Sequence, residues 1–308
     1  MAKQSLRAAY AEALIELGKK NDKLVVLDAD LAKATMTQKF KDVYPDRFYD
    51  FGIAEADMVC AAAGMAHCGL MPFVHTFALF GAGRAYEPIR NTVAYVNANV
   101  KFVFTHHGLN VGEDGGSHQA VEDINLMRGI PNMTILAPCD AAETKKAVFA
   151  AAEIDGPVYI RMIRIPCEDI TTEDTEFTVG KAVRLAEGSD LCLMATGTMV
   201  KVALDAAELL RAEGYSVGVV NHSTIKPIDR GCILEENARC KAIVTVEEHS
   251  VIGGLGSAVA EVIAGVPGAK FARIGIEDKF GKSGTPEDLF EAYGLTAAAV
   301  AEKCRKLL

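Results

Sequence analysis

We predict an α/β protein made of two β/α domains, each with a mostly parallel sheet covered by helices. Three observations lead to this fold class. Apolar, β-branched segments alternate with amphipathic segments along most of the 308 residues, and repeated β-α units form parallel sheets with helices on both faces. The length suits two domains of about 150 residues each. An acidic stretch without apolar periodicity, residues 167–175, interrupts the pattern where a linker would lie.

The first domain is expected at residues 1–166. Apolar residues recur at helical spacing from Ser5 to Gly18, which predicts the first helix. The same reasoning predicts the other elements of this domain: strands at 23–28, 72–77, 101–105, 133–138 and 158–164, and helices at 54–68, 84–97 and 141–153.

We expect a linker at residues 167–182 and a second, smaller β/α domain at residues 183–308. Its predicted elements are strands at 190–195, 216–220, 242–246 and 270–274, a helix at 200–213 and another after Gly256.

Composition restricts the function. The net charge of −9 argues against nucleic acid or an anionic membrane as the main partner, and an anionic substrate would need a local cluster of arginines. The eight cysteines are scattered without a Cys-x-x-Cys pair, which is typical of reduced thiols in the cytoplasm and indicates neither a zinc site nor a disulfide framework. Because no signal core or membrane-length apolar run is present either, we expect a cytoplasmic protein.

The most informative segment is the polar loop at residues 105–119. It holds three histidines, two carboxylates and four glycines, and it begins where the predicted strand at 101–105 ends. In open α/β sheets, ligands bind at the carboxyl ends of strands. A solvated surface loop is the alternative interpretation.

Two further segments contain candidate site residues. Glu55 begins a helix of small and apolar residues, where the helix dipole alone would favour a carboxylate. Phe77 and Phe80 follow a predicted strand, and taken alone they could be ordinary core residues.

Taken together, these segments resemble the transketolase group of thiamine-diphosphate enzymes over essentially the whole chain. The likeness is greatest to the C-terminal half of transketolase in its split form, with a pyrimidine-binding domain followed by the family's C-terminal domain. The matching motifs, in chain order, are Leu6-Arg7-Ala8-Ala9, Asp28-Ala29-Asp30-Leu31, Gly52-Ile53-Ala54-Glu55, Thr76-Phe77 with Phe80, His106 with Gly112-Glu113-Asp114-Gly115, His118-Gln119, and residues 156–164.

The resemblance implies a cofactor site. In this family a glutamate hydrogen-bonds the pyrimidine ring of thiamine diphosphate and drives it to the imino form, which removes the proton from the thiazolium C2 carbon. Glu55 matches this glutamate, and Phe77 and Phe80 match the apolar wall on which the pyrimidine stacks. Asp30 and Ile53 lie in motifs that border the cofactor, so they complete the expected cofactor-binding set.

The resemblance also implies a substrate site. His106 and His118 match histidines that face the substrate hydroxyls, with a pKa suited to proton transfer near neutrality. Asp114 matches an aspartate that binds a substrate hydroxyl. Arg7 and Arg164 match the arginines that hold the phosphate of a sugar phosphate, which a planar guanidinium can bind through two hydrogen bonds.

Three departures from the family pattern concern substrate detail. His107-Gly108 stands where many members have Asp-Ser, and Gly116-Ser117 stands where many have Pro-Thr. Ala34 stands where a phosphate-contacting serine is common, although Thr35 or Thr37 could take its place.

A part of the family's cofactor site has no counterpart here. The Gly-Asp-Gly segment and the later asparagine that hold the diphosphate and its bivalent metal do not occur. The resemblance therefore implies Mg²⁺ or another bivalent cation bound by a second, N-terminal diphosphate-binding subunit, in an α2β2 assembly.

We expect a transferase that moves a two-carbon ketol unit between sugar phosphates. Two alternatives use the same cofactor: the β subunit of a 2-oxoacid dehydrogenase and an enzyme similar to 1-deoxyxylulose-5-phosphate synthase. Asp114, His118 and Arg164 together count against an oxoacid enzyme, which needs no sugar-phosphate contacts. An alternative of another class is a non-catalytic regulatory subunit, which would have no use for Glu55.

Overall fold

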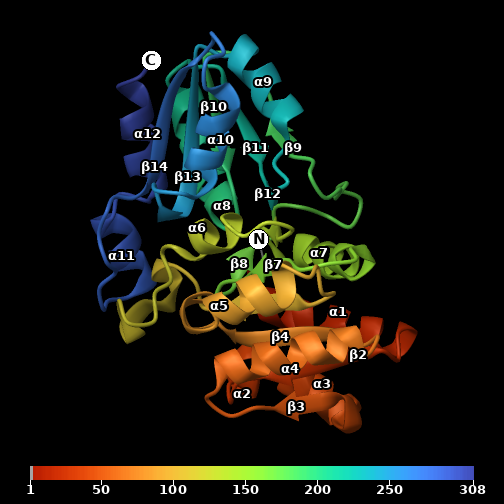
Figure 1. Cartoon of the computed structure of the whole chain (residues 1–308). Helices are drawn as coiled ribbons and strands as arrows, with labels where there is room; N and C mark the ends of the chain where they lie inside the picture. The colour runs from red at the N-terminus through yellow and green to blue at the C-terminus, as the bar shows by residue number, and fades with distance from the viewer. Residues whose placement is uncertain (1–2) are drawn as a thin grey trace.

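The computed structural model describes residues 3–308. It contains two large sheets of mostly parallel strands, one above the other in Figure 1. The first domain occupies the lower part of the view and the second domain the upper part. Both sheets carry helices on their two faces, so the predicted fold class is confirmed.

The first sheet has seven strands in the order β12-β6-β7-β5-β4-β2-β3. All neighbours are parallel except β12 and β6. The strands are β2 (Leu24–Asp28), β3 (Phe48–Asp50), β4 (Met71–Phe77), β5 (Lys101–Thr105), β6 (Thr134–Leu136), β7 (Val158–Arg161) and β12 (Thr224–Lys226).

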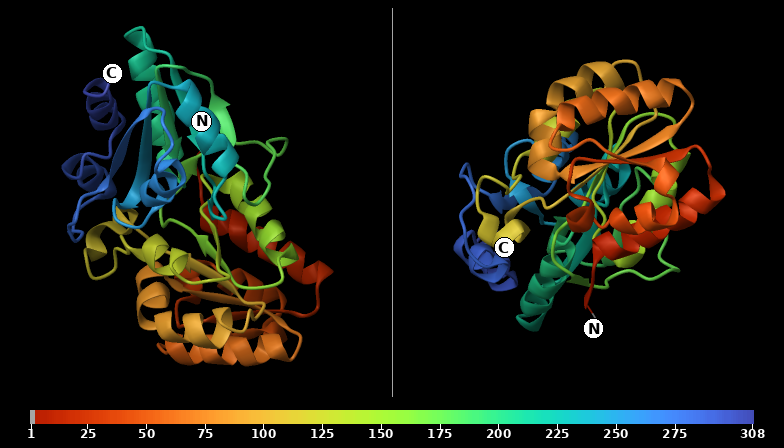
Figure 2. Two further views of the ribbon diagram at one scale, coloured as in Figure 1. Left: turned by 45° about the horizontal axis from the view of Figure 1, so that its top comes forward. Right: turned by 90° about the horizontal axis from the view of Figure 1, so that it is seen from below.

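Side chains of β2 alternate between two cores. Leu24 and Val26 pack with helices α1 (Leu6–Lys20) and α7 (Ala141–Glu153), while Val25 and Leu27 pack with α4 (Glu55–His67) and η3 (Ile89–Ala94). Because successive strand residues point to opposite faces, these helices cover opposite sides of the sheet, as the view from below in Figure 2 shows.

The second sheet has five strands in the order β14-β13-β10-β11-β9, with β9 antiparallel to β11. The strands are β9 (Val183–Ala186), β10 (Leu191–Ala195), β11 (Val217–Asn221), β13 (Ala242–Ser250) and β14 (Lys270–Ile276). Its helices are α8 (Met199–Ala212), α9 (Arg230–Arg239), α10 (Leu255–Ile263), α11 (Pro286–Ala292) and α12 (Ala297–Arg305).

The two domains are joined by more than a linker. β12 comes from the later part of the chain but pairs with β6 of the first sheet. The short strand β1 (Lys3–Gln4) pairs with β8 (Cys167–Glu168), which lies at the start of the expected linker. One apolar core also continues from α4 into the second domain, where Met194 and Ile243 belong to it.

Some predicted elements were wrong in extent. The helix expected at 84–97 is divided into η2 (Phe80–Arg84), α5 (Tyr86–Pro88) and η3, which ends at Ala94. The strand expected at 158–164 ends at Arg161. Beyond it, Ile163 lines a cavity and Arg164 Nη1 donates to the backbone oxygen of Val111, so these residues leave the strand pairing. The remaining elements are α2 (Ala32–Thr35), α3 (Gln38–Val43), η1 (Pro45–Arg47), η4 (Leu109–Asp114) and α6 (Asp123–Arg128). Within residues 3–308 no helix has the length and apolarity that crossing a membrane requires.

Candidate active site

The loop between β5 and α6 lies beyond the carboxyl ends of the central strands. β5 pairs with β4, so Thr105 and Phe77 are direct neighbours at this edge of the sheet. Parallel strands bring the residues that follow them to one edge. His106 and Phe80 therefore start from adjacent strand ends although they are far apart in the sequence.

Four rings gather at this edge. The ring of His106 stacks on Phe77 with 3.9 Å between the centroids, and Phe77 stacks on Phe80 at 5.8 Å. The imidazole of His118 meets Phe80 edge-on at 5.2 Å and Phe77 at 6.5 Å. All four side chains belong to the expected site, and together they form one aromatic wall.

Glu55 is joined to this wall through Arg84. The glutamate is the first residue of α4 and is 5% exposed. Its Oε1 accepts a hydrogen bond from Nη1 of Arg84 at 2.9 Å, and the Arg84 guanidinium lies 4.2 Å from the ring centre of Phe80. A buried carboxylate beside flat aromatic rings is suited to a planar heterocycle that can hydrogen-bond through a ring nitrogen.

Two arginines lie close together next to the polar loop. Nη2 of Arg7 donates to the backbone oxygen of Arg164 at 2.6 Å, and Nη1 of Arg164 donates to the backbone oxygen of Val111 at 2.6 Å. Burial and the nearby Arg164 charge lower the pKa of Arg7. The carboxylates of Glu113 and Asp114 form long, half-exposed ion pairs with Arg164, at 3.7 and 3.9 Å from its Nη1. Among the described residues no carboxylate lies within 4.0 Å of the Arg7 guanidinium, so Arg7 is the group of this pair that is available to an anionic ligand.

One expectation about His106 is wrong. Burial, followed by the charges of Arg7 and Arg164 and by His118, lowers the pKa of His106 to about 3 rather than leaving it near neutrality. The ring is therefore neutral at pH 7, when it can act as a hydrogen-bonding group but not as an imidazolium acid. Thr105 Oγ1 lies 2.8 Å from its Nδ1, while the His118 Nδ1 lies 3.0 Å from Ser117 Oγ.

Asp30 and Ile53 lie on neighbouring loops, apart from the ring cluster. The backbone N–H of Asp30 and that of Gly52 donate to the same oxygen of Asp50, at 3.1 and 3.0 Å. Asp30 is exposed and Ile53 is 76% exposed. The structure records no contact between these two residues and the rings or arginines, so their expected cofactor role stays a prediction.

Sequence reasoning missed a buried polar network between the loop and the second domain. Arg161 Nε donates to Asp123 Oδ2 at 2.7 Å, and the hydroxyl of Tyr159 donates to the same oxygen at 2.6 Å. Burial opposes ionisation of Asp123, but the Arg161 guanidinium holds its pKa below the usual range. Arg161 Nη2 also donates to the backbone oxygen of Glu248 at 3.0 Å. The available signals were charged residues inside apolar strands, Arg161 in β7 and residues 247–249 in β13.

Across residues 3–308 no group of three or more His, Cys, Asp and Glu side chains is arranged to hold a metal ion. The eight cysteines are all free thiols.

Comparisons with known proteins agree with this geometry. The family model described as transketolase, pyrimidine binding domain, matches residues 2–167, and the one described as transketolase, C-terminal domain, matches residues 180–300. A protein of Methanocaldococcus jannaschii that bears the provisional name of a transketolase C-terminal section is 48% identical over 303 residues, covering 97% of this chain and 95% of the relative.

Two further matches have a similar extent. A 6-deoxy-6-sulfo-D-fructose transketolase subunit of a Clostridium species is 41% identical over 302 residues, covering 98% of this chain and 94% of the relative. A solved split gene transketolase, described as an inactive β4 tetramer, has a TM-score of 0.92 and 48% identity, covering 99% of this chain and 98% of that one. Matches of this length and identity show that the chain belongs to the transketolase family.

Proposed function

We propose that this chain is the C-terminal subunit of a thiamine-diphosphate-dependent transketolase that moves a two-carbon ketol unit between sugar phosphates. The observation that carries the proposal is the buried carboxylate of Glu55 at one end of an aromatic wall that has a pair of arginines at its other end. A planar cofactor and an anionic sugar would each find a suitable surface there.

The residues fit the pyrimidine half of the cofactor. The Glu55 carboxylate would hydrogen-bond a ring nitrogen, and Phe77 and Phe80 would stack on the ring, with Asp30 and Ile53 at the border of the same half. When bound, thiamine diphosphate supplies a nucleophilic carbon for a ketose carbonyl and the electron sink for cleavage of the adjacent carbon–carbon bond. Because Glu55 is 5% exposed, its hydrogen bond to the ring would lie in a low-dielectric environment, where it would be stronger than in water.

The opposite end of the wall would bind the sugar. Arg7 and Arg164 would hold the terminal anion, and Asp114 would accept a hydrogen bond from a sugar hydroxyl. His106, which is neutral at pH 7, would hydrogen-bond a substrate oxygen, and His118 would transfer a proton. The name of the Clostridium relative refers to a sulfonated sugar, and two arginines could bind either a phosphate or a sulfonate.

We place the diphosphate and bivalent-metal ligands on a separate N-terminal subunit, in an α2β2 complex. The described residues hold no metal cluster, and the related split gene transketolase is described as inactive when it is a β4 tetramer. The scattered free cysteines support a cytoplasmic location.

The test is reconstitution. The purified chain should be folded but nearly inactive, and adding a diphosphate-binding subunit with thiamine diphosphate and Mg²⁺ should give ketol transfer between sugar phosphates. Phosphorylated, sulfonated and unsubstituted acceptors would be assayed in parallel. Strong activity of the chain by itself would contradict the need for a partner. A complex that decarboxylates 2-oxoacids but transfers no ketol unit would overturn the assignment as a transketolase.

A further inference from the structure

The second domain holds the loop that carries the expected substrate residues. Ser250 N donates to the backbone oxygen of Val121 at 2.7 Å, and Gln119 Nε2 donates to the backbone oxygen of Lys282 at 2.9 Å. The loop therefore lies between the first sheet and the second domain. Its shape depends on groups that come much later in the chain.

The most direct of these contacts is made by Glu248. This residue lies in β13 and is 2% exposed. Its Oε1 accepts the backbone N–H of Asn110 at 2.7 Å, and its Oε2 accepts the side-chain amide of the same residue. A carboxylate that accepts two N–H groups of one residue fixes both the position and the orientation of that residue.

The loop backbone is shaped around this carboxylate. Gly108 has a φ of +64°, and a Cβ atom at this position would overlap the Glu248 side chain. Only glycine meets both conditions at low cost, because it tolerates positive φ and leaves room for the carboxylate. This accounts for glycine at position 108, where the family pattern has serine.

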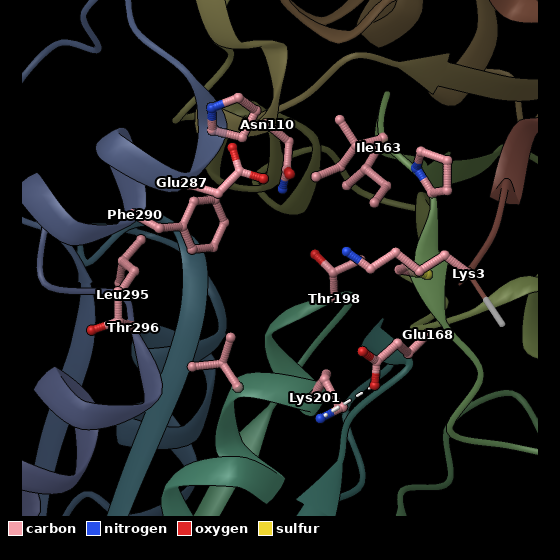
Figure 3. A pocket seen from close by; sticks show the side chains of 15 residues that line it. Lys3, Asn110, Ile163, Glu168, Thr198, Lys201, Glu287, Phe290, Leu295 and Thr296 are labelled. Atoms are coloured by element: carbon pink, nitrogen blue, oxygen red, sulfur yellow. Dashed lines mark ion pairs between the residues drawn. The ribbon is translucent and has the colours of Figure 1, made fainter. Parts of the chain in front are cut away.

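Packing and hydrogen bonds both act on Asn110. The residue is 2% exposed, and its neighbours Leu109 and Val111 are fully buried. Its side chain also borders a cavity of about 360 Å³ that Ile163 and Phe290 line, as Figure 3 shows. The Glu248 carboxylate accepts both the backbone N–H and the side-chain amide of Asn110, so it supplies the directional restraint on this residue.

Asn110 is covalently joined to the proposed anion site. The next residue, Val111, accepts the hydrogen bond of Arg164 Nη1 at 2.6 Å, and Asp114 Oδ2 lies 3.9 Å from the same nitrogen. A displacement of Asn110 would move the Val111 oxygen and thereby the Arg164 guanidinium relative to Asp114.

We infer that Glu248 is a positioning residue: from the second domain, its carboxylate holds Asn110 and so sets the relative placement of Arg164 and Asp114. The meaning of this placement for a sugar phosphate rests on the proposed function. The second domain would then have a definite task, which is to hold the substrate loop of the first domain.

Glu248→Gln tests the inference with almost no change in size. One carboxylate oxygen becomes an NH₂ group that faces the donating amide of Asn110. In the chain alone, amide hydrogen exchange of residues 109–114 should become faster, which requires neither cofactor nor partner. In the reconstituted complex, KM for a phosphorylated acceptor should rise about tenfold, the worth of one hydrogen bond, while kcat changes much less.

Glu247→Gln is the matched control. Glu247 is the neighbouring buried glutamate, but its carboxylate accepts the N–H groups of Leu255 and Gly256 at 2.7 and 2.8 Å within the second domain. This variant should reduce the melting temperature without a selective change in exchange at 109–114. An equal exchange pattern in the two variants would overturn the inference, because it would indicate general destabilisation.

The double variant Glu248→Gln/Asn110→Asp should restore the loop. The new glutamine would still accept the backbone N–H, and its NH₂ group would donate to the new carboxylate. Slow exchange and low KM should both return. If Glu248→Gln does not fold, Asn110→Ala removes only the side-chain bond and should change exchange and KM in the same direction. Exchange at the wild-type rate in the variants would refute the positioning role. If exchange is faster in the variants but the reconstituted wild-type complex transfers no ketol unit, only the proposed function is refuted.

Discussion

Replacing Glu55 with glutamine separates its proposed chemical role from its contribution to the fold. The side chain keeps its size and can still accept the hydrogen bond of Arg84, but it loses its negative charge. If Glu55 acts on the pyrimidine ring, the variant should bind the partner and remain folded, while proton exchange at C2 of the cofactor becomes much slower.

Glu55→Gln should reduce the free energy of unfolding only slightly. The partners of the Glu55 carboxylate are the N-terminus of α4 and Arg84, whose side chain is 54% exposed. An ion pair with so exposed a partner is screened by water, and the dipole effect is of similar size, so the loss should be about 1 kcal/mol or less. Loss of a positioned proton-transfer group typically costs about 10²- to 10⁴-fold in rate. The expected kinetic effect is therefore far larger than the effect on stability.

The assay is hydrogen–deuterium exchange at C2 of thiamine diphosphate in the reconstituted complex, with thermal unfolding measured in parallel. Asp57→Asn is the matched control, because Asp57 is an exposed carboxylate in the first turn of the same helix. It should lower stability by a similar amount and leave exchange unchanged. A glutamine variant that exchanges at the wild-type rate, or a control that slows exchange equally, would refute the assignment of Glu55.

Three further predictions concern other parts of the site. Arg164→Ala should raise KM for phosphorylated acceptors by about 10- to 100-fold, the worth of a charge-assisted hydrogen bond; an equal loss with unphosphorylated acceptors would indicate a structural role. Burial and the neighbouring arginines lower the pKa of His106 to about 3. Its ring should therefore remain neutral from pH 8 to pH 5 in NMR spectra of histidine-labelled protein, and a titration midpoint near 6.5 would contradict this environment. Asp123→Asn leaves the buried Arg161 without its counter-charge and should reduce the free energy of unfolding by about 3–5 kcal/mol in urea titrations; a loss below about 1 kcal/mol would show that Arg161 finds another partner.

The sequence by itself determined the order of elements and the type of each domain. The strand at 101–105 and the helix at 141–153 have their predicted bounds, because apolar periodicity reports local burial and both segments are strongly patterned. The motifs also indicated which polar residues follow which strands. Parallel pairing then brought His106 and Phe77 together, as the topology of an α/β sheet requires.

Only the tertiary structure decided which distant groups complete these local features. The contact between Asn110 and Glu248 spans 138 positions in the sequence, and β12 joins a sheet whose other strands all lie before residue 162. The pKa of His106 likewise depends on burial and on arginines from other elements. Periodicity shows that a residue is buried but not what it meets there. Hydrogen-bond partners, electric fields and domain contacts therefore became visible only when the chain was folded.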